Sequence, residues 1–170
     1  MNYRIIIGMF AIAFASGAVA SDLLSRAEER VNVMTAAIRS KDQLHAHLSS
    51  DPTSPLLALE PSKRKSFVES LLFTDAGLAS YSFLELEGLP STSIYRILTL
   101  FGVQADTADI RRSVGFEDAE VENILKRYSQ RPRDNLHRMC VISPHRPTRC
   151  VPNTGSRCPA GCGVEGQDPR

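Results

Sequence analysis

The sequence predicts an all-α protein: a small, irregular helical bundle of about five to six helices, with a cysteine-bearing, proline-rich C-terminal tail. Between residues 22 and 128, apolar residues recur at steps of three and four, which is the spacing of one helix face. The same region shows no alternation of strand and helix patterns and no repeat of fixed length. We therefore divide the chain into a signal peptide (1–20), a helical domain (21–128) and a basic tail rich in Cys and Pro (129–170).

The first twenty residues have the pattern of a secretory signal peptide. Arg4 provides a positive start, residues 5–15 are almost entirely apolar, and Ala18-Val19-Ala20 is a small-residue cleavage site. The apolar stretch is shorter than the ~20 residues that a membrane-spanning helix needs. We expect cleavage after Ala20 and an exported protein, periplasmic or secreted, with no membrane span after signal cleavage. The alternative is an uncleaved membrane anchor.

A long amphipathic helix is predicted from Asp22 to about Leu48. Its apolar stripe repeats at steps of three and four and consists of Leu24, Ala27, Val31, Met34 and Ile38. Two prolines and several small polar residues in 49–55 then end the helix. Core packing in a bundle is the ordinary role of such a stripe, and a partner-binding helix is the alternative.

Short elements joined by turns are predicted between residues 55 and 90. Residues 56–59 form one helical turn, and a new helix begins at Pro61 and runs to about Phe73, because proline is favoured at the first helical position. Residues 74–77 are a turn, and residues 78–81 are ambiguous and could be extended. Ser82 followed by Glu85 matches a capping box and predicts a short helix over 83–87.

The clearest helical signals lie between Ser91 and Tyr128. The first helix carries one apolar face, formed by Ile94, Ile97, Leu98 and Phe101. Gly102 follows that face, where glycine is the least costly left-handed closing residue. A short helix is predicted over 105–113. A further helix over 117–128 has acidic residues in its first turn and basic residues in its last, so both oppose the helix dipole.

The two parts of the mature chain carry opposite net charges. Residues 21–128 carry twelve basic and sixteen acidic side chains, a balance of −4, whereas residues 129–170 carry seven arginines and three acidic residues, a balance of +4. Because arginine pairs with two oxygens at once, this segment is a candidate contact for an anionic surface or an acidic protein. The proposed contact residues are Arg131, Arg133, Arg138, Arg146, Arg149 and Arg157. The segment has no aromatic ring, so stacked nucleic acid is not expected as a partner.

The four cysteines, Cys140, Cys150, Cys158 and Cys162, all lie in the last part of the chain. An even number in an exported protein favours two disulfides, and the sequence leaves all three pairings open. A local bond between Cys158 and Cys162 is sterically feasible. The alternative is a metal-binding tail, in which His137 and His145 would join the thiols. The spacing C-x9-C-x7-C-x3-C does not match a paired zinc motif, so no metal and no cofactor is expected.

No motif of a known catalytic class occurs in the sequence. We therefore expect an exported small helical binding or accessory protein, acting through protein or anionic-surface contacts, rather than an enzyme. The alternative is a hydrolase-like enzyme whose site forms only in the fold, from Glu85, Glu87, His45 or His47. The partner and the oligomeric state do not follow from the sequence.

Overall fold

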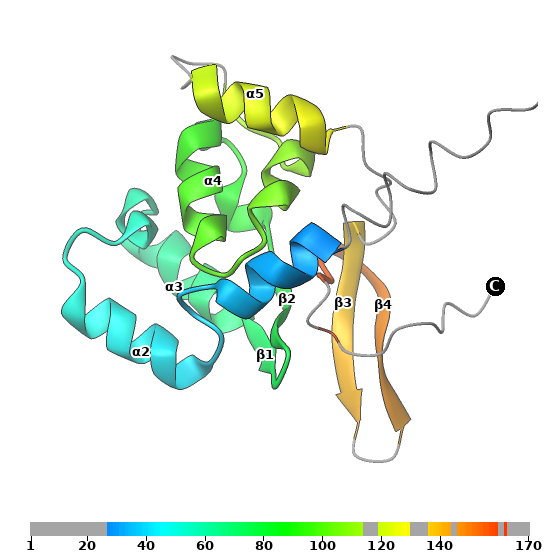
Figure 1. Ribbon diagram of the computed structural model, residues 1–170. Coiled ribbons are helices and arrows are strands. Elements are labelled where there is room, and N and C mark those ends of the chain that lie inside the picture. The colour runs from blue at the N-terminus through cyan, green and yellow to red at the C-terminus, as the bar shows by residue number, and fades with distance from the viewer. Residues whose placement is uncertain (1–26, 114–118, 130–135, 144–145, 160–161, 163–170) are drawn as a thin grey trace, which may run out of the picture.

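The structure is a computed structural model that describes residues 27–113, 119–129, 136–143, 146–159 and 162. The predicted signal peptide and Arg131, Arg133 and His145 lie outside the described residues. The fold is a mixed α and β structure, so the predicted all-α class is wrong. Helices form one body, and a four-stranded antiparallel sheet runs along one side of it (Figure 1).

The helices are short and follow the predicted order. A first helix covers 27–35 within the described residues. The later α-helices are α2 (Lys41–Ser50), α3 (Pro61–Ser70), α4 (Ser91–Thr99) and α5 (Ala119–Tyr128). Three 3-10 helices lie between them: η1 (Pro55–Ala58), η2 (Leu84–Leu86) and η3 (Gln104–Asp109). The turn at 56–59 and the start at Pro61 agree with the sequence predictions. A short helix also follows Ser82, but its N-cap is Phe83, and Ser82 binds the Glu85 side chain at 2.7 Å instead of forming the predicted capping box.

The long helix predicted over 22–48 is interrupted at residues 36–40. Ser40 caps a new helix by accepting a hydrogen bond from the amide of Gln43. The backbone amide of Ile38 donates to the carbonyl of Leu100, at 2.9 Å, so the linker is held against the end of α4. Two residues of the predicted stripe, Val31 and Met34, are 57% and 66% exposed, whereas Val33 of the same helix is buried.

Helix α4 lies at the centre of the main core, as its apolar face predicts. Ile94, Ile97, Leu98 and Phe101 are all fully buried. Phe101 contacts Phe67 of α3 edge to face, with ring centres 6.1 Å apart. The helix ends at Thr99, and the turn that follows closes at the predicted Gly102, which has a φ of +74°; a Cβ there would collide with the backbone of Asn32.

The sheet consists of β1 (Leu72–Thr74), β2 (Gly77–Ser82), β4 (Arg146–Arg157) and β3 (Leu136–Ser143), in that spatial order. Strands β1 and β2 form a hairpin across the predicted turn at 74–77. Strand β4 pairs with both β2 and β3, and it therefore joins the cysteine-rich segment to the body.

Both pairs of strands depart from the helical prediction. Leu72 and Phe73 lie in β1 rather than in the end of α3, which stops at Ser70. Prolines normally disfavour a strand, and the segment after residue 129 holds six of them, so the sequence suggested no strand there. Pro152 is nevertheless accommodated in β4, opposite Arg138.

Candidate functional site: a disulfide-bonded hairpin and its buried anchor

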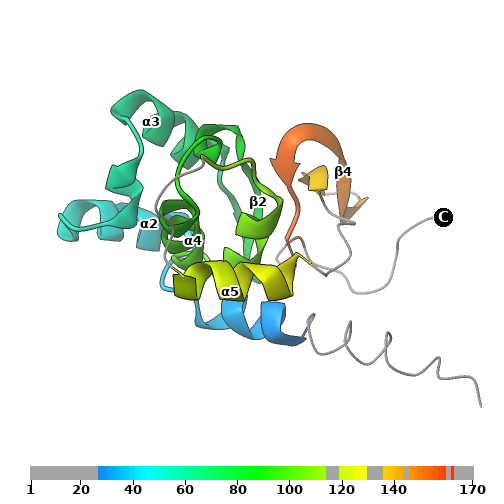
Figure 2. The same ribbon diagram turned by 90° about the horizontal axis from the view of Figure 1, so that it is seen from above.

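Strands β3 and β4 form a hairpin whose far end extends past the helices in Figure 1. Strand β4 is sharply bent, as its arched ribbon in Figure 2 shows. Eight residues of extended strand would separate Cys150 from Cys158 by about 26 Å. Their Cα atoms are 6.0 Å apart, because the chain turns back between them. The first part of β4 therefore pairs with β3, and its last two residues pair with β2.

The bend is centred near Gly155, which has a φ of +81°. The Gly155 amide donates to the Nδ1 atom of His137 at 3.2 Å, and its carbonyl accepts from the amide of Phe83 at 2.9 Å. His137 itself has a φ of +57°, where the register between β3 and β4 shifts, and its ring packs edge-on against Phe83. The bend is thus fixed to the body of the protein as well as to β3.

The base of the hairpin is anchored by a buried polar cluster. Arg157 lies directly opposite Tyr81 in the pairing of β4 with β2, so the two side chains share one face of the sheet. The Tyr81 hydroxyl donates to Asp106 of η3 at 2.8 Å, and Arg157 binds the other oxygen of the same carboxylate at 2.9 Å. Arg157 also donates to Asp109 at 3.1 Å. One guanidinium therefore joins β4 to two carboxylates of η3.

The electrostatics of this cluster follow from its burial. Burial raises the pKa of the Asp106 carboxyl, while Arg157 and the Tyr81 hydroxyl oppose that rise. Burial, with the nearby Asp106 charge, raises the pKa of the Tyr81 hydroxyl well above its usual value. The pKa of Arg157 is also raised, because the charges of its neighbours outweigh its desolvation. Both the guanidinium and the phenol thus keep their protons, and each remains a hydrogen-bond donor to Asp106.

The cysteines form two disulfides in the structure, as the sequence analysis expected. Cys140 is joined to Cys162, and Cys150 to Cys158. The local bond between Cys158 and Cys162 is therefore not the pairing observed. Cys140 and Cys150 are direct partners across β3 and β4, yet each bonds to a cysteine near the end of β4 or beyond it. The two bonds tie both strands of the hairpin to the segment that follows them.

The proposed anion-contact arginines do not act as one group. Arg157 is committed to Asp106 and Asp109 and is largely buried, so it is an anchor rather than a contact residue. Arg149 is exposed, and Arg138 is half-buried and donates to the carbonyl of Cys150 at 3.2 Å. Arg146 is a residue of β4 near the far end of the hairpin.

The residues named for a hydrolase site each make separate contacts near their own position in the chain. His45 is exposed. The Nε2 atom of His47 lies 2.8 Å from Ser54 Oγ and 3.8 Å from Asp51, so a single ring nitrogen faces both groups. A hydrolytic triad would place the carboxylate on the opposite ring nitrogen. Glu85 is bound by Ser82 and borders a shallow hollow of about 300 Å³ that Lys63 also lines. These local contacts do not bring the residues of the hydrolase alternative together.

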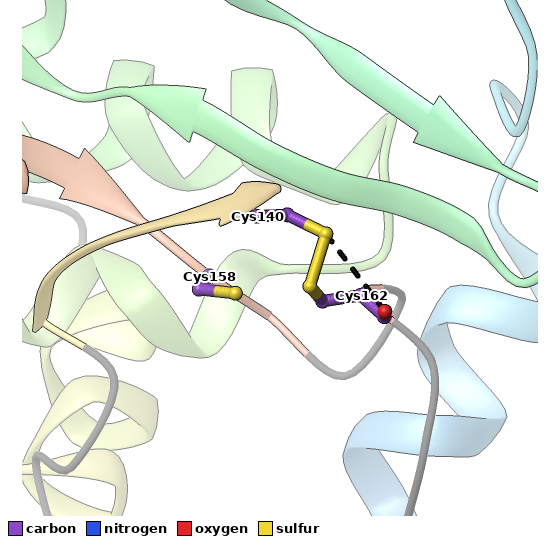
Figure 3. Close-up of side chains that lie close together, drawn as sticks. All are labelled: Cys140, Cys158 and Cys162. Atoms are coloured by element: carbon purple, nitrogen blue, oxygen red, sulfur yellow. Dashed lines mark hydrogen bonds between the residues drawn. A yellow bond between two sulfur atoms is a disulfide. The ribbon is translucent and has the colours of Figure 1, made fainter. Parts of the chain in front are cut away.

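The candidate metal ligands in the structure differ from those expected from the sequence. The Nδ1 atom of His137 accepts a hydrogen bond from the Gly155 amide, and the ring packs on Phe83. This histidine therefore stabilises the bend in β4. The sulfur atoms of Cys140, Cys158 and Cys162 nevertheless lie within 4.8 Å of one another and are buried (Figure 3). The sequence spacing did not suggest this cluster, because the bend in β4 brings the cysteines together.

Within the described ranges, no helix has both the length and the apolar character that a bilayer crossing requires. The two disulfides are compatible with an exported protein. Comparisons with protein-family models, curated proteins and solved structures give no match to this chain.

Proposed function

We propose that the protein is an exported binding protein and that its β3–β4 hairpin contacts an anionic lipid surface. The observation that carries this proposal is the hairpin itself: a projecting, arginine-bearing element that is anchored at its base by Arg157. Residues 136–157 contain four arginines and no acidic residue. Because Asp106 and Asp109 neutralise Arg157, the positive charge that remains belongs to residues 138–149.

The distribution of these arginines favours a lipid surface over a flat protein surface. Arg149 is opposite Val141 and shares its face of the hairpin, whereas Arg138 shares the opposite face with Cys140. Ile142, near the far end, is 50% exposed. An element with an exposed cation on one face, a half-buried cation on the other and an apolar residue near its end fits the interface of an anionic bilayer, where the cations meet head groups and the apolar side chain enters the acyl boundary.

Three rigid attachments support this function. Binding by a flexible segment would cost conformational entropy, because the segment must be ordered when it contacts its partner. Here two disulfides and the Arg157 anchor order the hairpin before contact. We infer that the helical body serves as the support of the hairpin, and that binding rather than catalysis is the activity.

The test is cosedimentation of the exported protein with vesicles of phosphatidylcholine, with and without phosphatidylglycerol. We expect binding only to the anionic vesicles and a decrease as salt rises, since the contact is electrostatic. In the Arg138→Gln/Arg149→Gln variant, each lost charge removes about 1 kcal/mol near an anionic surface, or roughly fivefold in affinity. Equal binding to neutral vesicles, or an unchanged affinity of the variant, would reject the proposal.

A matched control variant is Lys63→Gln/Lys65→Gln. It removes the same charge from two exposed positions of α3, outside the hairpin. Its affinity should equal that of the wild type if the hairpin carries the contact. An equal loss in both variants would instead assign the effect to net charge. An acidic protein partner, the other class that arginines fit, is favoured if neither vesicle type binds.

Export to the periplasm or the medium is also part of this proposal. Its support is the signal pattern in residues 1–20 together with the two disulfides, which form in oxidising compartments. Intact-mass measurement of exported protein should show a chain that begins at Ser21. A mass that retains residues 1–20 would reject cleavage after Ala20.

A further inference from the structure

We propose that the four cysteines become a zinc site when both disulfides are reduced, with Zn²⁺ bound by the thiolates of Cys140, Cys150, Cys158 and Cys162. This proposal does not depend on the lipid-binding function. The sulfurs of Cys140, Cys158 and Cys162 lie within 4.8 Å of one another. The Cys158 sulfur points toward the bond between Cys140 and Cys162 in Figure 3. The Cys150 sulfur is not one of these three, but it is bonded to that of Cys158, so after reduction we infer that it supplies the fourth ligand.

The distances suit a tetrahedral thiolate site. Zinc bonds thiolate sulfur at about 2.3 Å, which places the sulfurs of a tetrahedron about 3.8 Å apart. The three mutual distances are at most 4.8 Å, so side-chain rotations of small size would bring the sulfurs to that separation. A complete set of four soft ligands favours Zn²⁺ over hard ions such as Mg²⁺ or Ca²⁺.

The backbone contacts near the cysteines do not depend on the disulfides. Cys140 and Cys150 are paired partners in the ladder of β3 and β4. Cys158 directly follows Arg157, which is held by two carboxylates and by its pairing with β2. The Cys162 amide donates to the carbonyl of Pro159 at 3.2 Å. We therefore expect the four thiols to stay close together after reduction.

The surroundings of the cluster suit a closed structural site. Cys140, Cys158 and Cys162 are buried and pack against Ala79, and the half-buried Leu72 and Cys150 lie against the same cluster. Because the packing partners are apolar, water has little access to these three sulfurs. Cys150 is the most accessible of the four and gives a reductant its point of entry.

The chemistry requires a reductant, for which a water-soluble phosphine is the experimental choice. The phosphine opens each disulfide in a two-electron step, yields two thiols, and becomes a phosphine oxide with the oxygen of one water molecule. Zinc then binds the sulfurs as thiolates, and the four thiol protons pass to solvent. An oxidant that removes two electrons for each disulfide re-formed would release the metal. Disulfides and zinc therefore exclude one another at this site.

The experiment is titration of the phosphine-reduced full chain with Co²⁺, followed by displacement with Zn²⁺. We expect one metal ion per chain, with the sulfur-to-cobalt charge-transfer band and visible bands of a tetrahedral thiolate site. The oxidised protein should show none of these bands, and zinc should remove them from the reduced protein.

Two variants test the ligand set. Cys150→Ser leaves three sulfurs and should shift the cobalt bands toward a three-sulfur site and weaken affinity at least tenfold. His137→Asn should leave the spectrum unchanged, because the proposed site uses no histidine. Reduced protein that binds no cobalt, or that shows octahedral bands typical of oxygen ligands, would overturn the proposal. Equal affinity in Cys150→Ser would do the same.

Discussion

Tyr81 and Arg157 lie opposite each other on β2 and β4, and both bind the carboxylate of Asp106. The phenol donates at 2.8 Å to one oxygen and the guanidinium contacts the other at 2.9 Å. Three elements that are distant in the sequence are thereby joined: strand β2, helix η3 and the end of strand β4. This contact is the main polar link that positions the β3–β4 hairpin.

Replacing Arg157 should destabilise the whole protein. The Arg157→Met change would leave Asp106 and Asp109 without their cation in a largely buried position. Removing one partner of a buried ion pair costs about 3–5 kcal/mol. Urea unfolding followed by circular dichroism measures this loss in the free energy of unfolding. The control is Arg149→Met, an exposed position of the same strand, which should change stability by less than about 0.5 kcal/mol. Equal effects of the two changes would contradict the anchor.

Tyr81 should make the protein sensitive to alkaline pH. Burial raises the pKa of its hydroxyl in the folded state, whereas the unfolded chain ionises at about pH 10. The stability that this group contributes is therefore complete below about pH 10 and is lost as pH rises toward the folded-state pKa. The free energy of unfolding should decline above pH 10 in the wild type and decline less steeply in Tyr81→Phe.

The Tyr81→Phe variant also tests the hydrogen bond to Asp106. At pH 7 it should be less stable than the wild type by about 1.5–3 kcal/mol, because a buried carboxylate loses a donor. Thermal melts at a series of pH values measure both effects. Parallel stability curves for the two proteins above pH 10 would show that Tyr81 ionises as freely in the folded chain as in the unfolded one.

Ile97→Asp should prevent stable folding of the helical body. The Ile97 side chain is fully buried on the central face of α4. A carboxylate there must be buried without a partner or must separate α4 from the core, and either outcome costs several kcal/mol, comparable with the stability of a small domain. Met34→Asp is the control, because Met34 is 66% exposed and should tolerate the charge. A wild-type melt for Ile97→Asp would reject the assigned core.

A fragment of residues 21–128 should melt at a lower temperature than the whole mature protein. The division of the chain after residue 128 predicts that these residues fold on their own, and that stays a prediction. The contacts of Arg157 now argue against full stability, since the fragment leaves β2 without β4 and leaves Asp106 and Asp109 without their cation. Differential scanning calorimetry of both chains gives the comparison. Equal melting temperatures would mean that β3 and β4 add nothing to the stability of the body.

The helices could be predicted because their signals are local. The spacing of Ile94, Ile97, Leu98 and Phe101, the proline at the start of α3 and the closing Gly102 each act within one or two helical turns. The two disulfides likewise followed from the even number of cysteines behind a signal pattern, without their pairing. For the same reason, the break between the first helix and α2 was missed: Ile38 is fixed by a carbonyl of α4, a contact that no local pattern records.

The sequence by itself determined the order of the helices and the presence of disulfides, because each depends on neighbours in the chain or on composition. Only the tertiary structure decided that residues after 129 supply strands, that β4 bends at Gly155, and that Arg157 is an anchor instead of a contact residue. Strand pairing and buried ion pairs join residues far apart in sequence: Tyr81 with Arg157, and Cys140 with Cys162. Their energies come from contacts that form only when the chain has folded, and so they leave no periodic mark in the sequence.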